Sequence, residues 1–150
     1  MSANAETLKA AKSFALYRKL ESKEIMKIAV IVVRTLIGLL FLFASITYFL
    51  TSPPSPEFTG NTKIFMDGLA ASGYIIPVAK IFELLCGLAF VSGRFVALAV
   101  VLIFPIALNI LFIHSIHLPS GLPVAIPLFL GILFLAYSQR DKYAPLFTSK

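Results

Sequence analysis

The sequence predicts an all-α membrane protein: a four-helix transmembrane bundle with an N-terminal amphipathic arm and a short interfacial helix between spans one and two. Two observations predict this class. The 150-residue chain is 59% hydrophobic and only 13% charged, whereas soluble domains carry about 25% charged residues. Its mean hydropathy is +0.92, and the apolar residues gather in long stretches. Such an apolar excess is too large for one small core, so lipid has to cover the rest.

Four apolar stretches are long enough to cross a bilayer as helices. They cover about residues 25–50, 74–91, 95–114 and 122–137. The prolines within residues 51–56 end the first span, because proline cannot continue a helix. Pro105 falls inside the third span, where a transmembrane helix tolerates it. Short turns at residues 92–94 and 118–121 make the later spans antiparallel, so we expect left-handed four-helix packing.

Two segments outside the spans complete the predicted architecture. Residues 1–24 form a basic arm in front of a membrane domain of residues 25–150. Apolar positions in this arm recur at helical spacing, at Leu8, Ala11, Phe14 and Ala15. The pattern predicts an amphipathic helix on the membrane surface, although a partly disordered tail fits the composition equally well. Residues 57–73 combine polar groups with a short amphipathic pattern, which predicts the interfacial helix.

The placement of charge predicts the orientation in the membrane. The net charge is +6, and the basic residues gather in the arm, at Arg94 between spans two and three, and after span four. In the other two connections, Lys63 is the only Lys or Arg. Since cytoplasmic loops carry the excess of Lys and Arg, we expect both termini in the cytoplasm. The same placement indicates contact with anionic lipid and argues against a nucleic-acid partner.

Ionisable side chains within the spans are the first candidates for a site, because charge at membrane depth is costly and needs a partner or a function. Arg34, Lys80 and Glu83 are the clear cases. Counting from the inner ends of the helices puts Arg34 about 10 Å deep and Glu83 about 15 Å deep, so we expect an Arg34–Glu83 ion pair. Lys80 shares a helix face with Glu83, and Asn109 of the third span lies near the depth of Lys80.

Small residues accompany these charges and favour close contact between the first two spans. Gly38 and Ser45 lie on the stripe of Arg34, and Gly87 lies on the stripe of Glu83. Phe41 sits between the two small residues of span one. We therefore expect the close approach to be local.

Two interpretations of the polar residues Arg34, Lys80, Glu83 and Asn109 are open. In the first, they satisfy one another and fix the register of the helices. In the second, they line a ligand pocket for a polar headgroup such as a quinone carbonyl. Glu83 and Arg34 would then orient the ligand, while Lys80 or Asn109 would donate a hydrogen bond to it.

The sequence identifies no catalytic residue, because it contains no nucleotide-binding glycine loop, nucleophile elbow or HExxH motif. His114 and His117 are weak metal candidates at i, i+3, but a zinc site normally needs a third or fourth ligand. We predict no metal. Cys86, the single cysteine, lies in an apolar run and is expected to serve packing. No bound-cofactor motif is present, so any electron transfer requires a diffusible cofactor, such as a quinone, or a partner protein.

The polar and glycine positions of the spans also form a series of short motifs in a defined order. Span one reads Arg34-Thr-Leu-Ile-Gly38 and continues to Ser45 and Tyr48; span two reads Glu83-Leu-Leu-Cys-Gly87, followed by Gly93-Arg94. Pro105-Ile-Ala-Leu-Asn109 in span three and Arg140-Asp-Lys-Tyr143-Ala-Pro145 in the tail continue the series. Over about residues 28–147 the chain resembles the DoxX family of small bacterial four-helix membrane proteins.

The resemblance has two departures. The family's second glycine in span one is Ser45 here, and its lysine is Tyr48. Any role of that lysine is therefore in doubt for this chain, unless Lys80 replaces it.

The resemblance implies a function in the bacterial cytoplasmic membrane. The family takes its name from a subunit associated with a thiosulfate:quinone oxidoreductase, which implies a redox-associated, quinone-interacting subunit or accessory. Fold transfers between relatives more safely than function. Two alternatives therefore stand beside it: a non-enzymatic binder or carrier of a small molecule or lipid, and a structural assembly partner of other membrane subunits.

Overall fold

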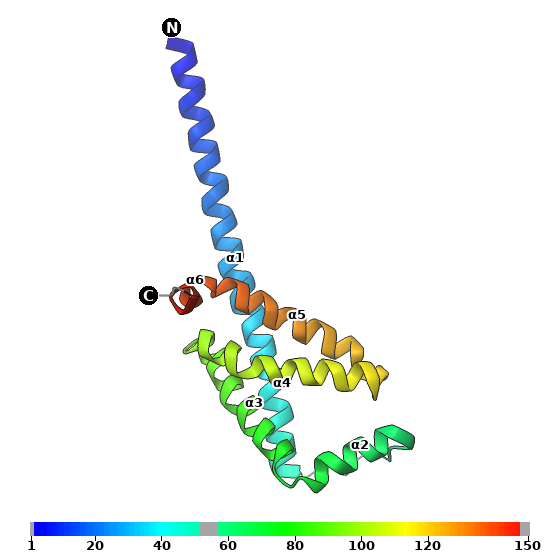
Figure 1. Cartoon of the computed structure of the whole chain (residues 1–150). Helices are drawn as coiled ribbons and strands as arrows, with labels where there is room; N and C mark the ends of the chain where they lie inside the picture. Colours follow the sequence, from blue (N-terminus) through cyan, green and yellow to red (C-terminus); the bar gives the residue numbers. More distant parts are fainter. Residues whose placement is uncertain (1, 52–56, 148–150) are drawn as a thin grey trace. The chain divides into compact units, whose positions relative to one another are not determined.

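The computed structural model describes residues 2–51 and 57–147, and the side-chain surroundings of residues 12–51 and 57–145. Within these ranges the chain is helical and contains no strand, which confirms the predicted all-α class. The helices (Figure 1) are α1 (Ser2–Thr51), α2 (Gly60–Ala71), α3 (Ile75–Ser92), α4 (Val96–Ile116), α5 (Leu122–Ser138) and α6 (Arg140–Tyr143). Two 3-10 turns, η1 (Pro119–Gly121) and η2 (Ala144–Phe147), complete them.

The chain forms two compact units, residues 1–32 and 33–150. This division falls later than the expected boundary at residue 24, because the arm and the first span are one continuous helix, α1. In the first unit every side chain from Lys12 to Ile28 is exposed. The arm is helical, and none of the side chains from Lys12 to Ile28 is buried within this unit. The side chains of Leu8 and Ala11, and the proline segment 52–56, lie outside the described residues.

Four helices of the described chain are long and apolar enough to cross a membrane, which defines a multi-pass membrane protein. The candidate spans are Lys12–Thr51, Ile75–Ser92, Val96–Ile116 and Pro119–Ser138. The last three agree closely with the sequence prediction. Only 22% to 28% of each apolar window is buried inside the molecule. The remaining apolar surface is the part that lipid has to cover.

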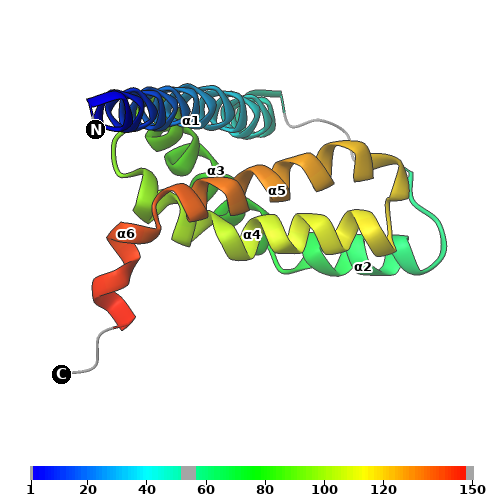
Figure 2. The ribbon, with the colours of Figure 1, turned by 90° about the horizontal axis from the view of Figure 1, so that it is seen from above.

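Each span buries one narrow stripe of residues at helical spacing. The buried positions are Ile37, Gly38, Phe41 and Ser45 on α1; Glu83, Cys86, Gly87 and Phe90 on α3; Val96, Ala99, Val100, Ile103 and Ala107 on α4; and Ala125, Leu128, Ile132 and Leu135 on α5. Cys86 packs in this core as predicted and is a free thiol. The stripes of α4 and α5 meet where these helices lie side by side (Figures 1 and 2).

Helices α1 and α3 touch backbone to backbone at two glycines. A Cβ atom added to Gly38 would lie 3.0 Å from the carbonyl oxygen of Gly87, and one added to Gly87 would lie 3.1 Å from the carbonyl oxygen of Gly38. Both distances are shorter than ordinary van der Waals contact, so a larger residue at either position would require the neighbouring backbone to move. The predicted local approach is therefore real, and it occurs at Gly38 rather than at Ser45, whose hydroxyl donates to the Phe41 carbonyl of its own helix.

A third glycine, Gly131 of α5, allows α1 to pack closely against α5. A Cβ atom on Gly131 would lie 2.7 Å from Cδ1 of Ile37. Ile37 is buried there, and its neighbour on the same stripe, Phe41, is 1% exposed. Residues 33–51 of α1 therefore contact both α3 and α5.

The predicted interfacial helix is α2, and it is attached to the end of α4. The ring of Phe65 stacks on His117, with centroids 4.5 Å apart and planes 9° from parallel. The Thr62 hydroxyl donates to the His117 carbonyl at 3.3 Å. Gly73 follows α2 with a φ of 71° and turns the chain into α3.

The tail returns to the start of α4. The Tyr143 hydroxyl donates to the Ala97 carbonyl at 2.9 Å. Burial raises the pKa of the Tyr143 phenol above its ordinary value of 10.0. The neutral phenol therefore remains the hydrogen-bond donor over the physiological pH range.

The glycine contact predicts the stability of the bundle. Gly38→Ala should destabilise the protein by about 1–3 kcal/mol, because the new methyl group overpacks against a backbone oxygen that cannot move away cheaply. The measurement is the midpoint of unfolding in detergent. Gly68→Ala in α2 is the matched control, since a Cβ atom there meets nothing within 4 Å. Equal midpoints for the two variants would contradict the assigned contact.

Candidate ligand site

Glu83 is the one buried carboxylate of the described residues, with 3% of its surface exposed. Its Oε2 accepts a hydrogen bond from the Lys80 ammonium at 2.7 Å. The two residues are i, i+3 on α3, so the helix itself brings them together. The Lys80 side chain is 23% exposed and that of Glu83 only 4%. The lysine therefore shields the carboxylate at the edge of the core.

The expected Arg34–Glu83 ion pair is wrong, because Glu83 pairs with Lys80 and Arg34 turns away to Gly93. The reason is the register of α1 and α3, which run in opposite directions (Figure 1). Gly38 and Gly87 mark the level at which the helices touch. Arg34 and Glu83 lie one helical turn to opposite sides of that level, which separates them by about 12 Å along the axes at 1.5 Å per residue.

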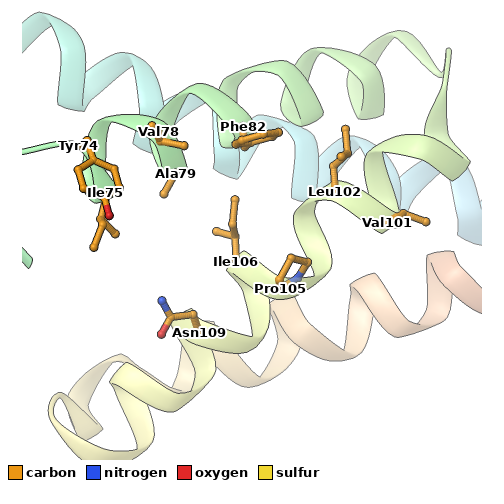
Figure 3. Close-up of a pocket in the computed structure, with 10 residues that line it drawn as sticks. All are labelled: Tyr74, Ile75, Val78, Ala79, Phe82, Val101, Leu102, Pro105, Ile106 and Asn109. Atoms are coloured by element: carbon orange, nitrogen blue, oxygen red, sulfur yellow. The ribbon is translucent and has the colours of Figure 1, made fainter. Parts of the chain in front are cut away.

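Asn109 does not join the charges either, because it lines a groove from which Lys80 and Glu83 are absent. This cavity between α3 and α4 has a volume of about 530 Å³. Its walls are Tyr74, Ile75, Val78, Ala79, Phe82, Val101, Leu102, Pro105, Ile106 and Asn109 (Figure 3). The four predicted ligand residues are therefore divided among three places: the Lys80–Glu83 pair, the Gly93 turn and this groove.

The groove is amphipathic along its length. Tyr74 and Asn109 carry its polar side chains, and both lie toward the same end in Figure 3. Phe82 and Leu102 lie toward the opposite end. The two helices run antiparallel here, so the start of α3 and the second half of α4 supply the polar end together. A molecule with a polar head and an apolar body fits this distribution of groups.

Pro105 adds a backbone feature to the groove. Proline has no N–H, so the carbonyl of Val101, four residues earlier, loses its usual intrahelical donor. Both residues line the cavity. The helix that forms this wall therefore contains a backbone carbonyl without its usual intrahelical donor.

Two other cavities are less suited to an amphipathic ligand. The cavity between α1 and α5, about 420 Å³, has only apolar side chains and glycine along its walls, including Val33, Leu36, Pro123 and Pro127. The cavity beside α2, about 540 Å³, contains Glu57, Lys63 and Asp67, but Lys63 and Asp67 already pair with each other. The first cavity therefore has no polar side chain, and half of the residues that line the second cavity are polar.

The two histidines pack against different parts of the chain. His114 contacts the Ile110 carbonyl through Nδ1 at 2.8 Å, and its ring occupies the space beside Gly121. His117 stacks on Phe65. Among the described residues no three of the types His, Cys, Asp and Glu form a group that could hold a metal ion.

The sequence prediction did not include Tyr74 among the candidate ligand residues. The available signal was the topology: in antiparallel spans, the first residue of one helix lies near the last turns of the next. Asn109 and Tyr74 satisfy that relation.

Comparisons with family models, curated proteins and solved structures find no match for the chain.

The ion pair on α3 predicts an asymmetric mutational response. Lys80→Met should destabilise the protein by about 1.5–3 kcal/mol, because it leaves a buried carboxylate without its charged donor. The double variant Lys80→Met, Glu83→Leu should recover much of that loss, since no charge remains buried. Unfolding midpoints of the parent, both single variants and the double variant measure the coupling. Additive effects would show that the pair contributes nothing to stability.

Proposed function

We propose that this chain is a DoxX-like protein of the bacterial cytoplasmic membrane that binds a quinone-class molecule in the groove between α3 and α4, as a subunit or accessory of a redox system. The observation that supports this most is the amphipathic groove, which places Asn109 and Tyr74 at one end and apolar side chains along the rest. Quinones combine a ring bearing carbonyl oxygens with a long apolar tail, and so match both parts.

The chemistry assigned to each wall follows from its groups. The Asn109 amide nitrogen donates to a quinone carbonyl, and the Tyr74 hydroxyl is the second polar contact. Phe82 and Leu102, which lie toward the opposite end of the groove, contact the apolar tail. The exposed side of Val101 faces the apolar surroundings of the span, from which such a ligand enters.

Of the two roles that the sequence left open for the charged residues, the structural one fits Lys80 and Glu83. Lys80 and Glu83 lie on α3 but do not line the groove. Their pair fixes the face that α3 turns toward the core, which supports the groove without touching the ligand. Tyr74 is the one titratable side chain along the groove, so binding and presentation of the quinone fit better than its reduction here. A partner protein would supply the electrons.

A non-redox binder or carrier of small amphipathic molecules is the second candidate function. The same scarcity of titratable groups favours it, since simple binding requires no proton donor. The two candidates differ in the partner: a redox accessory transfers electrons to its bound quinone when an electron-donating subunit is present, and a carrier does not.

The groove makes a direct prediction about bound quinone. Asn109→Leu should lower affinity about fivefold, the effect of losing one net hydrogen bond of about 1 kcal/mol. Ala79→Trp should abolish binding by filling the cavity. Val124→Trp, which places the same bulk in the α1–α5 cavity, is the matched control. The measurement is quinone extracted from purified protein, or titrated into it.

Retention of quinone by the folded Ala79→Trp variant would remove the groove from consideration. Loss of quinone in Val124→Trp alone would move the site to the cavity between α1 and α5. If the parent neither retains nor binds quinone, the quinone proposal fails.

The proposed orientation has both termini in the cytoplasm, supported by Arg94 in the α3–α4 turn and the basic residues of the arm and tail. A fluorescent protein fused after Lys150 should fold and fluoresce in cells. Alkaline phosphatase fused after Ser120 in η1 should be active, because that turn faces the periplasm. An active phosphatase at Lys150 would refute the orientation.

A further inference from the structure

The guanidinium group of Arg34, on α1, lies against the backbone of the turn between α3 and α4. A Cβ atom placed on Gly93 would collide with the guanidinium carbon and both terminal nitrogens of Arg34. Gly93 also has a φ of 76°, a conformation that favours glycine. The turn therefore has a bare backbone at the point where the guanidinium sits.

The Arg34 guanidinium has no acceptor in the described part of the chain. Its Nε is buried and makes no hydrogen bond. The ion pairs formed among the described residues involve Lys27, Lys63, Lys80 and Arg140, and not Arg34. A guanidinium presents five N–H donors in a planar fork. A partly buried fork without an acceptor requires one from outside the chain.

A second arginine stands at the same turn. Arg94 follows Gly93 directly, is exposed, and has no ion pair among the described residues. Asp141, an acidic residue of the tail, is paired with Arg140: its Oδ1 lies 3.9 Å from the Arg140 Nε. The turn thus combines two guanidinium groups, and no carboxylate of the described residues pairs with either of them.

Apolar side chains adjoin this basic turn. Phe95 is 76% exposed and Leu98 is 56% exposed at the start of α4. Val91, at the end of α3, is also exposed. An anion that binds the arginines therefore lies beside a surface that acyl chains can cover. A phosphate ester with two acyl chains satisfies both features, whereas a free anion satisfies only the first.

We propose that Arg34, Gly93 and Arg94 form a binding site for the phosphate of an anionic phospholipid such as phosphatidylglycerol. Arg34 binds two phosphate oxygens with its fork, as guanidinium groups do with phosphate. Arg94 adds the second charge, and the acyl chains follow Phe95 and Leu98. This site is separate from the α3–α4 groove and does not depend on a ligand there.

The test is thermal unfolding of the full-length protein in a neutral detergent, with three additives compared: dioleoylphosphatidylglycerol, dioleoylphosphatidylcholine and inorganic phosphate. Phosphatidylglycerol should raise the unfolding temperature of the parent more than phosphatidylcholine does, and inorganic phosphate should have little effect. Arg34→Gln should weaken phosphatidylglycerol binding about tenfold or more through loss of the bidentate contact.

Gly93→Ala is the most specific variant, because it keeps every charge but displaces the guanidinium from the turn. It should lose the phosphatidylglycerol effect as Arg34→Gln does. Arg18→Gln removes the same charge from the arm, and its response should equal that of the parent. Native mass spectrometry of the parent supplies a measurement that needs no variant to fold: it should retain anionic phospholipid.

Three results would overturn the proposal. An equal response of Arg34→Gln and the parent would show that Arg34 is not the binding group. An equal effect of inorganic phosphate and phosphatidylglycerol would identify a free-anion site instead. Absence of retained anionic phospholipid in the parent, together with no thermal shift, would exclude the site altogether.

Discussion

The contact between Gly38 and Gly87 determines much of this structure. Two helices that meet through bare backbone can do so at only one level, because side chains to either side keep them apart. That level sets which residues of α1 face which residues of α3. It puts Arg34 beside the Gly93 turn and leaves Glu83 to be neutralised by Lys80 of its own helix. A different register would have produced the central cluster of charges that the sequence suggested.

The fold was predictable because hydropathy and helix length carry most of the information in a membrane protein. The boundaries of the last three spans, the interfacial helix and the buried Cys86 all follow from local patterns. The glycine contact was also visible, since Gly38 and Gly87 lie on the stripes of the polar residues. Its level relative to Arg34 was not visible. Depth counted separately from each helix end carries errors of one turn, and one turn decides whether an arginine meets a glutamate.

The arrangement of the candidate site was less predictable for a related reason. Charge draws attention in an apolar sequence, so Lys80 and Glu83 appeared to be site residues. The structure gives them a mutual partner, while the groove is built from Tyr74, Asn109 and apolar side chains. Pro105 removes one backbone donor, and Asn109 is a single amide in the second half of α4. Neither residue stands out in the amino-acid composition. Their significance appears only when α3 and α4 are placed side by side.

The neutralisation of Glu83 by a residue on its own helix has a consequence for how the protein enters the membrane. A carboxylate whose counter-ion came from another span would cross into lipid unpaired and wait there for its partner. Lys80 lies one turn away, so their ion pair can form as soon as α3 is helical. Helix α3 can then be inserted without α1 already in place, and the glycine contact needs only to join two finished spans. The order of synthesis and the order of assembly are in this way independent of each other.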